Sequence, residues 1–265
     1  MKISPKRAML TLICCSLLAS PIFGEASAEE KSDHFGLDPL TDSLLLGGGL
    51  LLNIGDIAIE SAAEQPGGWG FDASADLLPV NPLDRLFVLP YSEPLKSASG
   101  ILTYAALLAP AVMLAAPVSE WVTIGTMYAE SVIWTWGLKE LGKNLIHRNR
   151  PYMYFAGFPQ DEITSGDFQQ SFPSGHTSLA FTGAGFCAFV FSEYFENSPW
   201  KAPIIAASYA LAIYAAGLRV ASGSHFLTDV IAGAVIGTLS GYLVPWLHTQ
   251  EFSIAILPSG VSVRL

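Results

Sequence analysis

Three long stretches of the chain carry no charged side chain, and they constrain the fold more than any other feature. They cover residues 101–119, 202–218 and 230–247. Each is close to the about 20 residues that cross the hydrocarbon core of a bilayer as a helix. With 51% hydrophobic and only 14% charged residues, the chain also lacks the charge that solvates a water-soluble surface. The sequence therefore predicts an all-α, polytopic membrane helical bundle.

Three further segments are weaker candidates for membrane helices. Residues 121–138 contain Glu130, and residues 177–192 are short and contain glycine. Residues 43–63 carry two acidic side chains, each of which costs a few kcal/mol near the bilayer centre unless it is shielded. We expect about six helices in a single domain that covers residues 29–265. The predicted helices lie near residues 43–63, 101–119, 121–141, 176–192, 202–220 and 228–247.

The N-terminus has the features of a targeting segment. Three basic residues within the first seven precede an apolar stretch, residues 8–23, and the small residues at 26–28 offer a cleavage site. Residues 1–28 are therefore predicted to be a signal peptide, or an uncleaved N-terminal anchor because Pro21 interrupts the apolar stretch. Either reading places the protein at the inner membrane of a bacterium.

The charge of the chain is unevenly distributed. The net charge of -10 makes nucleic acid an improbable partner. Four of the thirteen basic residues nevertheless lie within twelve positions: Lys139, Lys143, Arg148 and Arg150. Lys143 and Arg150 are about two helical turns apart, so both can lie on one face of a helix end. This basic segment either faces anionic lipid headgroups or holds a phosphate.

A second polar cluster is Ser174, Gly175 and His176, which follow Pro173 and precede an apolar run. This is the arrangement of a loop that leads into a helix N-terminus, where free N–H groups bind phosphate oxygens. Glycine permits the close approach of a ligand. A helix cap formed by Ser174 is the alternative interpretation. The polar link before this cluster, residues 152–172, is either a lid over the site or an ordinary surface loop.

A third cluster contains Arg219, His225 and Asp229 at the start of the last apolar run. The spacing of His225 and Asp229 suits a hydrogen bond from one imidazole nitrogen to the carboxylate. That bond would fix the tautomer and leave the other nitrogen free to attack phosphorus. Arg219 adds a permanent cation that can bind two oxygens. A helix cap is the alternative role for the acidic residue.

Glycines recur every fourth residue in the last apolar run, at Gly233, Gly237 and Gly241. On a helix they form one smooth face that a neighbouring helix can approach closely. We predict that this face serves packing and not chemistry.

Taken together, three motifs resemble a known signature. Lys143-x6-Arg150-Pro151, Pro173-Ser174-Gly175-His176 and Arg219-x5-His225-x3-Asp229 are similar to the three-part signature of the phosphatidic acid phosphatase type 2 superfamily. The superfamily contains six-helix membrane phosphatases acting on lipid phosphates, soluble periplasmic acid phosphatases, and vanadium haloperoxidases on a related helical core. The resemblance therefore implies the haloperoxidase-like helical core and a phosphatase activity.

The resemblance also implies a role for each matching residue. His225 would be the nucleophile that forms a phosphohistidine, Asp229 its orienting partner, and His176 the general acid. The residues expected to hold the phosphate oxygens are Lys143, Arg150, Ser174, Gly175 and Arg219. No metal and no other cofactor is implied, since fixed cations stabilise the charge. Leu218 departs from the pattern, which usually has serine before the third-motif arginine.

The expected substrate is a phosphorylated lipid, such as phosphatidic acid, phosphatidylglycerol phosphate, an isoprenyl diphosphate or a lipid A phosphate. Membrane lipids are the expected partners, and no obligate protein partner is evident. Counting crossings leaves the sidedness of the site open, and analogy with bacterial members favours the periplasmic face. Two other interpretations stay open at this point: a soluble periplasmic acid phosphatase of broad range, and a non-enzymatic anion-binding or transport protein of the membrane.

Overall fold

The computed structural model describes residues 35–62, 80–157, 159–250, 253–257 and 260–264. These belong to one compact unit, His34–Leu265. The predicted signal peptide, residues 1–28, lies outside the described residues.

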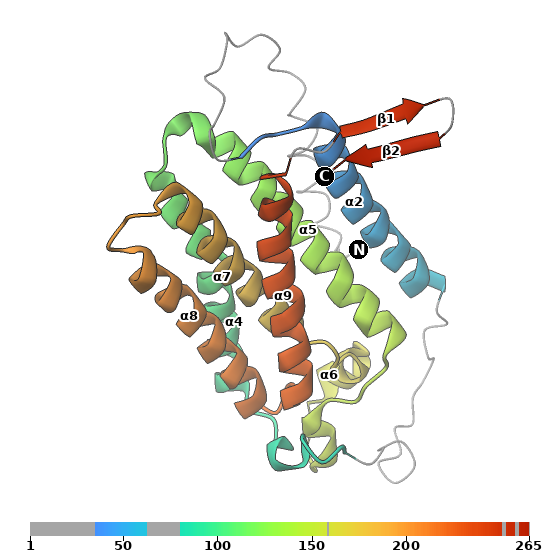
Figure 1. The fold of residues 1–265 in the computed structure, drawn as a ribbon. Helices are drawn as coiled ribbons and strands as arrows, with labels where there is room; N and C mark the ends of the chain where they lie inside the picture. Colours follow the sequence, from blue (N-terminus) through green and yellow to red (C-terminus); the bar gives the residue numbers. More distant parts are fainter. Residues whose placement is uncertain (1–34, 63–79, 158, 251–252, 258–259, 265) are drawn as a thin grey trace, which may run out of the picture. The chain divides into compact units, whose positions relative to one another are not determined.

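Long helices make up most of the described chain, which confirms the predicted all-α class (Figure 1). They are α2 (Pro39–Ala62), α4 (Glu93–Leu107), α5 (Trp121–Leu145), α7 (Gly175–Tyr194), α8 (Lys201–Ala221) and α9 (Leu227–Leu247). Short helical elements join them: η2 (Arg85–Phe87), η3 (Ala109–Ala115), η4 (Val118–Glu120), η5 (Pro151–Tyr154), α6 (Gln160–Thr164) and η6 (Asp167–Gln169). After α9, the strands β1 (Ser253–Leu257) and β2 (Gly260–Arg264) pair as an antiparallel hairpin that the sequence did not lead us to expect.

Helix α4 differs most from its predicted position near residues 101–119. It begins at Glu93, with a proline in its first turn, where proline is tolerated because the first N–H groups have no intrahelical partner. This first turn contains two charged residues, Glu93 and Lys96, so it lies outside the uncharged stretch of the sequence. The helix ends at Leu107, and the chain continues as the 3₁₀ helix η3, whose first turn contains Pro110. The predicted span therefore consists of two helical pieces.

Within the part of the chain that the structure describes, four helical segments are long and apolar enough to cross a membrane: Pro39–Ser61, Glu93–Ala115, Lys201–Ala221 and Leu227–Leu247. Large apolar side chains on their outer faces are exposed, including Leu51 on α2, Ile213 on α8 and Ile231 on α9. Exposed apolar surface of this kind suits lipid and not water.

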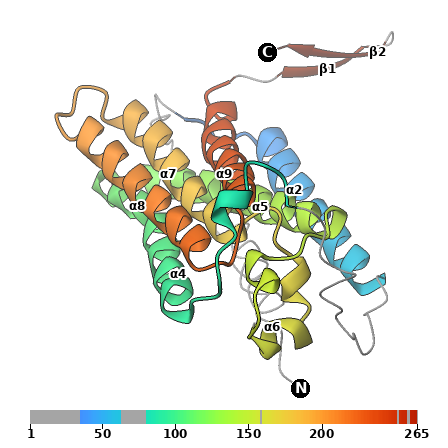
Figure 2. The same cartoon turned by 90° about the horizontal axis from the view of Figure 1, so that it is seen from below.

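Helix α7 lies inside the bundle. It contacts α4, α5, α8 and α9, and Figures 1 and 2 show it between α8 and α9. Most of its side chains are buried, so it is surrounded by protein along most of its length. The described spans thus enclose α7, whose N-terminus carries the second predicted cluster.

The packing of α9 on α7 depends on the predicted glycine face. A Cβ added at Gly237 would lie 2.0 Å from the carbonyl oxygen of Ser178, and one added at Gly241 would lie 2.4 Å from that of Thr182. Both distances are too short for any side chain, so the two backbones touch directly. The packing role predicted for these glycines is confirmed. The same contact holds the start of α7 beside the start of α9.

Candidate active site

Three segments that are far apart in the sequence meet at the ends of α5, α7 and α9. At the start of α7, the N–H of Ser174 donates to the carbonyl oxygen of Asp229 at 3.0 Å. Just after α5, Nη1 of Arg150 lies 2.9 Å from the carbonyl oxygen of Ser224 and 3.1 Å from Nε2 of His225. Figure 1 shows α6 beside the same ends of α5 and α9. The three clusters predicted from the sequence therefore converge.

The hydrogen bonds of His225 determine its tautomer. A guanidinium group can only donate, so Nε2 of His225 accepts the hydrogen bond from Arg150. Nδ1 lies 2.7 Å from the carbonyl oxygen of Ser171, which can only accept, so Nδ1 carries the hydrogen. Burial, followed by the charges of Arg150 and Arg219, holds the pKa of His225 well below its usual 6.5. The ring is therefore neutral and has its lone pair on Nε2.

Asp229 does not make the hydrogen bond to His225 that the spacing led us to expect. Its Oδ2 lies 3.9 Å from Nδ1 of His225 and instead accepts from Oγ of Ser171 at 2.5 Å and from the N–H of Phe226 at 2.9 Å. The reason is local: α9 begins only at Leu227, so His225 lies before the helix and not one turn below Asp229 on it. Asp229 is therefore linked to His225 through Ser171. Asp229 accepts a hydrogen bond from the Ser171 hydroxyl, and the Ser171 carbonyl oxygen orients the His225 ring.

Arg148 neutralises Asp229, and the sequence motifs do not include it. Its guanidinium forms an ion pair with Asp229 and a second one, of 2.7 Å, with Asp84. Asp84 is fully buried and accepts from the N–H of Thr228 at 3.0 Å, so it also caps α9 from a distant loop. The guanidinium carbon of Arg148 lies 4.1 Å from the ring centre of Phe226. This network fixes the start of α9 and the carboxylate beside His225.

The polar link at residues 152–172 is built into the site and is not a free surface loop. The N–H of Arg150 donates to the carbonyl of Phe168 at 2.8 Å, so the link folds back along the segment that precedes it. Oδ2 of Asp167 accepts from Nη2 of Arg150 at 2.7 Å. Burial raises the pKa of Asp167, but the charges of Arg150 and Lys143 and the hydrogen bonds with Glu162 and Arg150 together outweigh it and lower this pKa. Asp167 thus holds the guanidinium whose other nitrogen faces His225.

The other predicted cations surround the same region. Arg219 is 2% exposed, its Nη1 donates to Oγ of Ser99 at 3.2 Å, and its Nε has no hydrogen-bond partner among the described residues. Nζ of Lys143 lies 3.6 Å from a carboxylate oxygen of Glu140. Lys139, one turn earlier, is buried and is also paired with Glu140. Glu140 therefore pairs with both lysines and links them at the end of α5.

The second motif forms the start of α7 as predicted. Ser174 is the N-cap, and its Oγ accepts from Oγ1 of Thr177 at 2.9 Å. Gly175 is the first residue of the helix, and a Cβ added there would lie 3.1 Å from Cδ of Lys139. His176 follows in the first turn, within the electrostatic reach of the cations of the first and third motifs, Lys143, Arg150 and Arg219. The cap role of Ser174 is confirmed, and its hydroxyl hydrogen can still be donated to a ligand.

Comparison with known proteins identifies the family. The model of the PAP2 superfamily matches residues 121–253, which is half of the chain and includes all three motifs. The chain belongs to the PAP2 superfamily. The PAP2 assignment confirms the family resemblance noted in the sequence.

Several individual proteins are similar to this PAP2 chain over parts of their length. It is 37% identical over 101 residues to a lipid A 1-phosphatase of Porphyromonas gingivalis, a match that covers 38% of this chain and 20% of that protein. It is 34% identical over 108 residues to the bacitracin transport permease protein BcrC of Bacillus licheniformis, covering 40% and 48%. It is 33% identical over 89 residues to a probable diacylglycerol pyrophosphate phosphatase of Schizosaccharomyces pombe, covering 32% of each. The chain therefore spans from a fifth to about half of the length of these relatives.

A solved structure is also similar to this PAP2 chain. It is the first transmembrane PAP2 type phosphatidylglycerolphosphate phosphatase from Bacillus subtilis, with 20% identity and a TM-score of 0.44. The match covers 78% of this chain and 95% of that one.

The site residues predicted from the sequence of this PAP2 protein lie in one region of the structure, but not all of them make the expected contacts. Arg150 and His225 touch, Ser174 and Asp229 are joined through their backbones, and Arg219 lies near enough for its charge to act on His225. Four further residues contribute contacts that the motifs did not reveal: Asp84, Arg148, Asp167 and Ser171. Arg148 belongs to the basic segment, which the sequence had singled out. Nothing in the sequence around Asp84 indicated its role.

Proposed function

We propose that the chain is a membrane phosphatase that removes a phosphate from a phosphorylated lipid through a phosphohistidine on His225, without a catalytic metal. The observation that carries the proposal is the state of His225. Its ring is neutral, its Nδ1 is fixed on the carbonyl of Ser171, and its Nε2 lone pair points at the guanidinium of Arg150. A nucleophilic nitrogen beside fixed cations is what an attack on a phosphate needs.

The first displacement follows from this geometry. When the phosphate enters, Arg150 transfers its hydrogen bond from Nε2 to a phosphoryl oxygen, and Arg219, Lys143 and the N–H of Gly175 hold the other oxygens. Nε2 then forms a bond to phosphorus while the bond to the lipid oxygen breaks. Burial and the charges of Arg219 and Arg150 hold the pKa of His176 well below 6.5 in the ligand-free site, and the bound phosphate anion offsets those charges so that His176 takes up a proton. His176 then gives this proton to the leaving oxygen. The Nδ1 hydrogen of His225 stays on the ring.

The second displacement returns the enzyme to its starting state. Water attacks phosphorus, its proton goes to the neutral His176, and the bond between phosphorus and Nε2 breaks. The products are inorganic phosphate and a reprotonated His176. Asp229 stabilises the positive ring of the intermediate from 3.9 Å and through Ser171. Because fixed cations hold the transferred group throughout, the cycle needs no metal ion.

Two observations support a lipid as the substrate. Arg219 and His225 lie at the end of α8 and just before α9, two helices that are long and apolar enough to cross a membrane, so the site faces the level of the lipid headgroups. Two of the relatives are named as phosphatases of lipid A and of diacylglycerol pyrophosphate, which are a phosphorylated lipid and a lipid diphosphate. We therefore propose a phosphomonoester or diphosphate of a lipid, with phosphatidic acid, phosphatidylglycerol phosphate, isoprenyl diphosphate and lipid A as the candidates.

We place the protein in a bacterial inner membrane with the site on the periplasmic face. This assignment determines on which side of the membrane the two ends of the chain must lie. Helix α9 is a full span that separates His225 at its start from His248 after its end, and the N–H of Gly36 donates to the carbonyl of His248 at 3.2 Å. A periplasmic site therefore requires the segment before α2, and the chain after α9, to be cytoplasmic. It also requires that residues 1–28 do not carry the segment after them across the membrane. A fluorescent protein fused after Leu265 should be fluorescent, and an alkaline phosphatase fused there should be inactive; the opposite pair of results would place the site in the cytoplasm.

The function is tested by phosphate release from a panel of phosphorylated lipids in detergent. The wild-type protein should release inorganic phosphate without added metal and should be inhibited by vanadate. The His225→Ala variant should lose at least about a thousandfold in kcat, since the nucleophile is absent. His147→Ala, which removes an exposed histidine from the segment before Arg150, is the matched control and should keep full activity. Full turnover by purified His225→Ala protein would refute the assignment.

The same membrane preparation distinguishes the proposed function from the soluble-phosphatase and transport-protein interpretations. A soluble acid phosphatase would leave washed membranes in carbonate, whereas a protein with the spans described here should need detergent. A transport protein would bind or move anions without turnover, and one relative is named as a bacitracin transport permease protein. Phosphate release that depends on His225 excludes this interpretation.

A further inference from the structure

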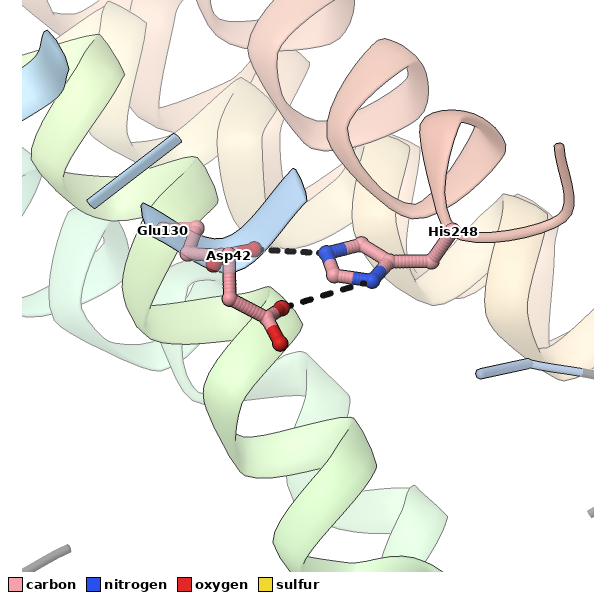
Figure 3. A group of neighbouring side chains, drawn as sticks. All are labelled: Asp42, Glu130 and His248. Atoms are coloured by element: carbon pink, nitrogen blue, oxygen red, sulfur yellow. Dashed lines mark hydrogen bonds and ion pairs between the residues drawn. The ribbon is translucent and has the colours of Figure 1, made fainter. Parts of the chain in front are cut away.

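A second cluster of ionisable side chains lies far from the candidate active site, at the opposite end of α9. It contains Asp42 from the first turn of α2, Glu130 from α5 and His248 directly after α9 (Figure 3). One donor atom from each residue lies within 4.8 Å of the other two. Nothing in the proposed phosphatase mechanism uses these side chains.

We propose that Asp42, Glu130 and His248 bind a divalent transition metal ion, with Zn²⁺ as the best fit. The donor set is one imidazole nitrogen and two carboxylate oxygens. An imidazole ligand favours zinc and its neighbours over magnesium or calcium, which prefer oxygen alone. Among divalent ions of this group, zinc also binds more tightly than manganese or iron at the same ligands.

Unsatisfied charge is the first argument for a metal. Glu130 is fully buried, and its Oε1 has no hydrogen-bond partner among the described residues. The same is true of Oδ1 of Asp42. Two carboxylates and one imidazolium would still leave one net negative charge in this buried place. A divalent cation with a neutral imidazole balances the charge completely and supplies a partner for both free oxygens.

The orientation of His248 is the second argument. Its Nδ1 lies 3.1 Å from the carbonyl oxygen of Gly36 and donates to it. This leaves Nε2, 2.7 Å from Oε2 of Glu130, as the nitrogen that can bind an ion. Histidines that bind metals commonly donate their other N–H to a backbone carbonyl, which fixes the ring. Binding of the ion displaces the proton that otherwise lies between Nε2 and Glu130.

The distances allow an ion with small side-chain movements. Ligand atoms around an ion with bonds of about 2.1 Å lie about 3 to 4 Å apart. The close pair, Nε2 of His248 and Oε2 of Glu130, has to open slightly from 2.7 Å. Asp42, whose Oδ1 is 3.7 Å from Nδ1 of the same ring, has to rotate toward Nε2. Its side chain is the most exposed of the three, which leaves it room to do so.

The ion would join three elements that are distant in the sequence. Helix α2 packs mainly on α5, and the cluster ties its first turn to α5 and to the end of α9. A metal there stabilises the folded state, because the three ligands come together only when the protein folds. The proposed role is therefore structural.

The test uses the full chain in detergent, stripped with a chelator and then equilibrated with Zn²⁺ alone. We expect about one zinc ion per chain by mass spectrometry, and a higher thermal midpoint than in the stripped protein. Glu130→Gln should weaken zinc binding by at least tenfold. Glu60→Gln, which removes an acidic side chain from the other end of α2, is the matched control and should bind zinc normally. Co²⁺ in place of zinc should give visible absorption bands that are lost in Glu130→Gln.

Substoichiometric zinc in the wild-type protein, or unchanged zinc binding in Glu130→Gln, would overturn the proposal. If Glu130→Gln does not fold, Asp42→Asn decides, because Asp42 is partly exposed and its loss should weaken zinc binding tenfold while leaving the midpoint of the stripped protein unchanged. Equal zinc affinity in this variant also overturns the proposal. Chelation should leave the rate of phosphate release unchanged below the thermal midpoint, so this inference and the proposed function are judged by separate readouts.

Discussion

Replacing Gly237 by alanine tests whether the contact between α7 and α9 positions the site. The added Cβ would lie 2.0 Å from the carbonyl oxygen of Ser178, and backbone atoms of Thr182 lie 2.9 Å away. These neighbours are backbone, so no side chain can turn aside. The helices must separate by about 1 Å locally, and overpacking of this kind costs about 1 to 3 kcal/mol. We expect the thermal midpoint of the variant to fall accordingly.

The effect on activity should be larger than the effect on stability. Helix α7 carries His176 and α9 carries Asp229, so their separation moves the proposed general acid away from the group that supports the proposed nucleophile. A displacement of about 1 Å at reacting groups can lower the rate by about a hundredfold. The assay is phosphate release in detergent at a temperature where both proteins are folded. Gly217→Ala on α8 is the matched control, since its Cβ would meet nothing within 4 Å and alanine favours the helix.

One pair of results would refute this reasoning. If Gly237→Ala melts at the wild-type temperature and turns over at the wild-type rate, then α9 does not press on the backbone of α7 as described. Loss of activity in Gly217→Ala as well would show that the assay reports general damage to the helices.

Further outcomes follow from the network around His225. Arg148→Met leaves two buried carboxylates without their cation and should cost about 3 kcal/mol or more of folding free energy in a chemical unfolding experiment, with Arg148→Lys recovering only part. Ser171→Ala keeps the carbonyl that orients His225 but loses the hydroxyl that donates to Asp229, so kcat should fall by about tenfold and stability by about 1 kcal/mol, measured in parallel. The lowered pKa of His225 means that the unfolded chain binds a proton below pH 6.5 that the folded chain does not bind; the thermal midpoint should therefore fall as the pH drops through this range, and less steeply in His225→Asn.

Those parts of the site that depend on residues close together in the sequence could be predicted from the sequence alone. Ser174 caps α7 because a small polar residue before an apolar run is a local signal for a helix start. Arg150 follows the end of α5, and the backbone then places it beside Ser224 and His225. The chain bears the helices that its uncharged runs predict, apart from the first turns of α4.

The contacts that the sequence did not reveal depend on long-range packing. Asp84 and Arg148 are 64 residues apart, and nothing in the spacing of either one indicates the other. The hydrogen bond expected between His225 and Asp229 failed for a local reason, because α9 begins two residues after His225. The start of α9 agrees with the predicted helix near residue 228, so the boundary was predicted well; the error was to apply a helical i, i+4 contact to a histidine that precedes the helix.

The buried Nε of Arg219, which has no hydrogen-bond partner among the described residues, has a thermodynamic consequence for the ligand-free protein. A buried N–H without an acceptor is a penalty that the ligand-free state carries by itself. A bound phosphate oxygen accepts a hydrogen bond from this N–H and removes the penalty, and no hydrogen bond within the protein has to break first. Part of the affinity for phosphate therefore comes from removing this penalty, in addition to the attraction between opposite charges. Inorganic phosphate or vanadate should therefore raise the melting temperature. Released phosphate should also inhibit the enzyme by competing with substrate for the Nε–H of Arg219.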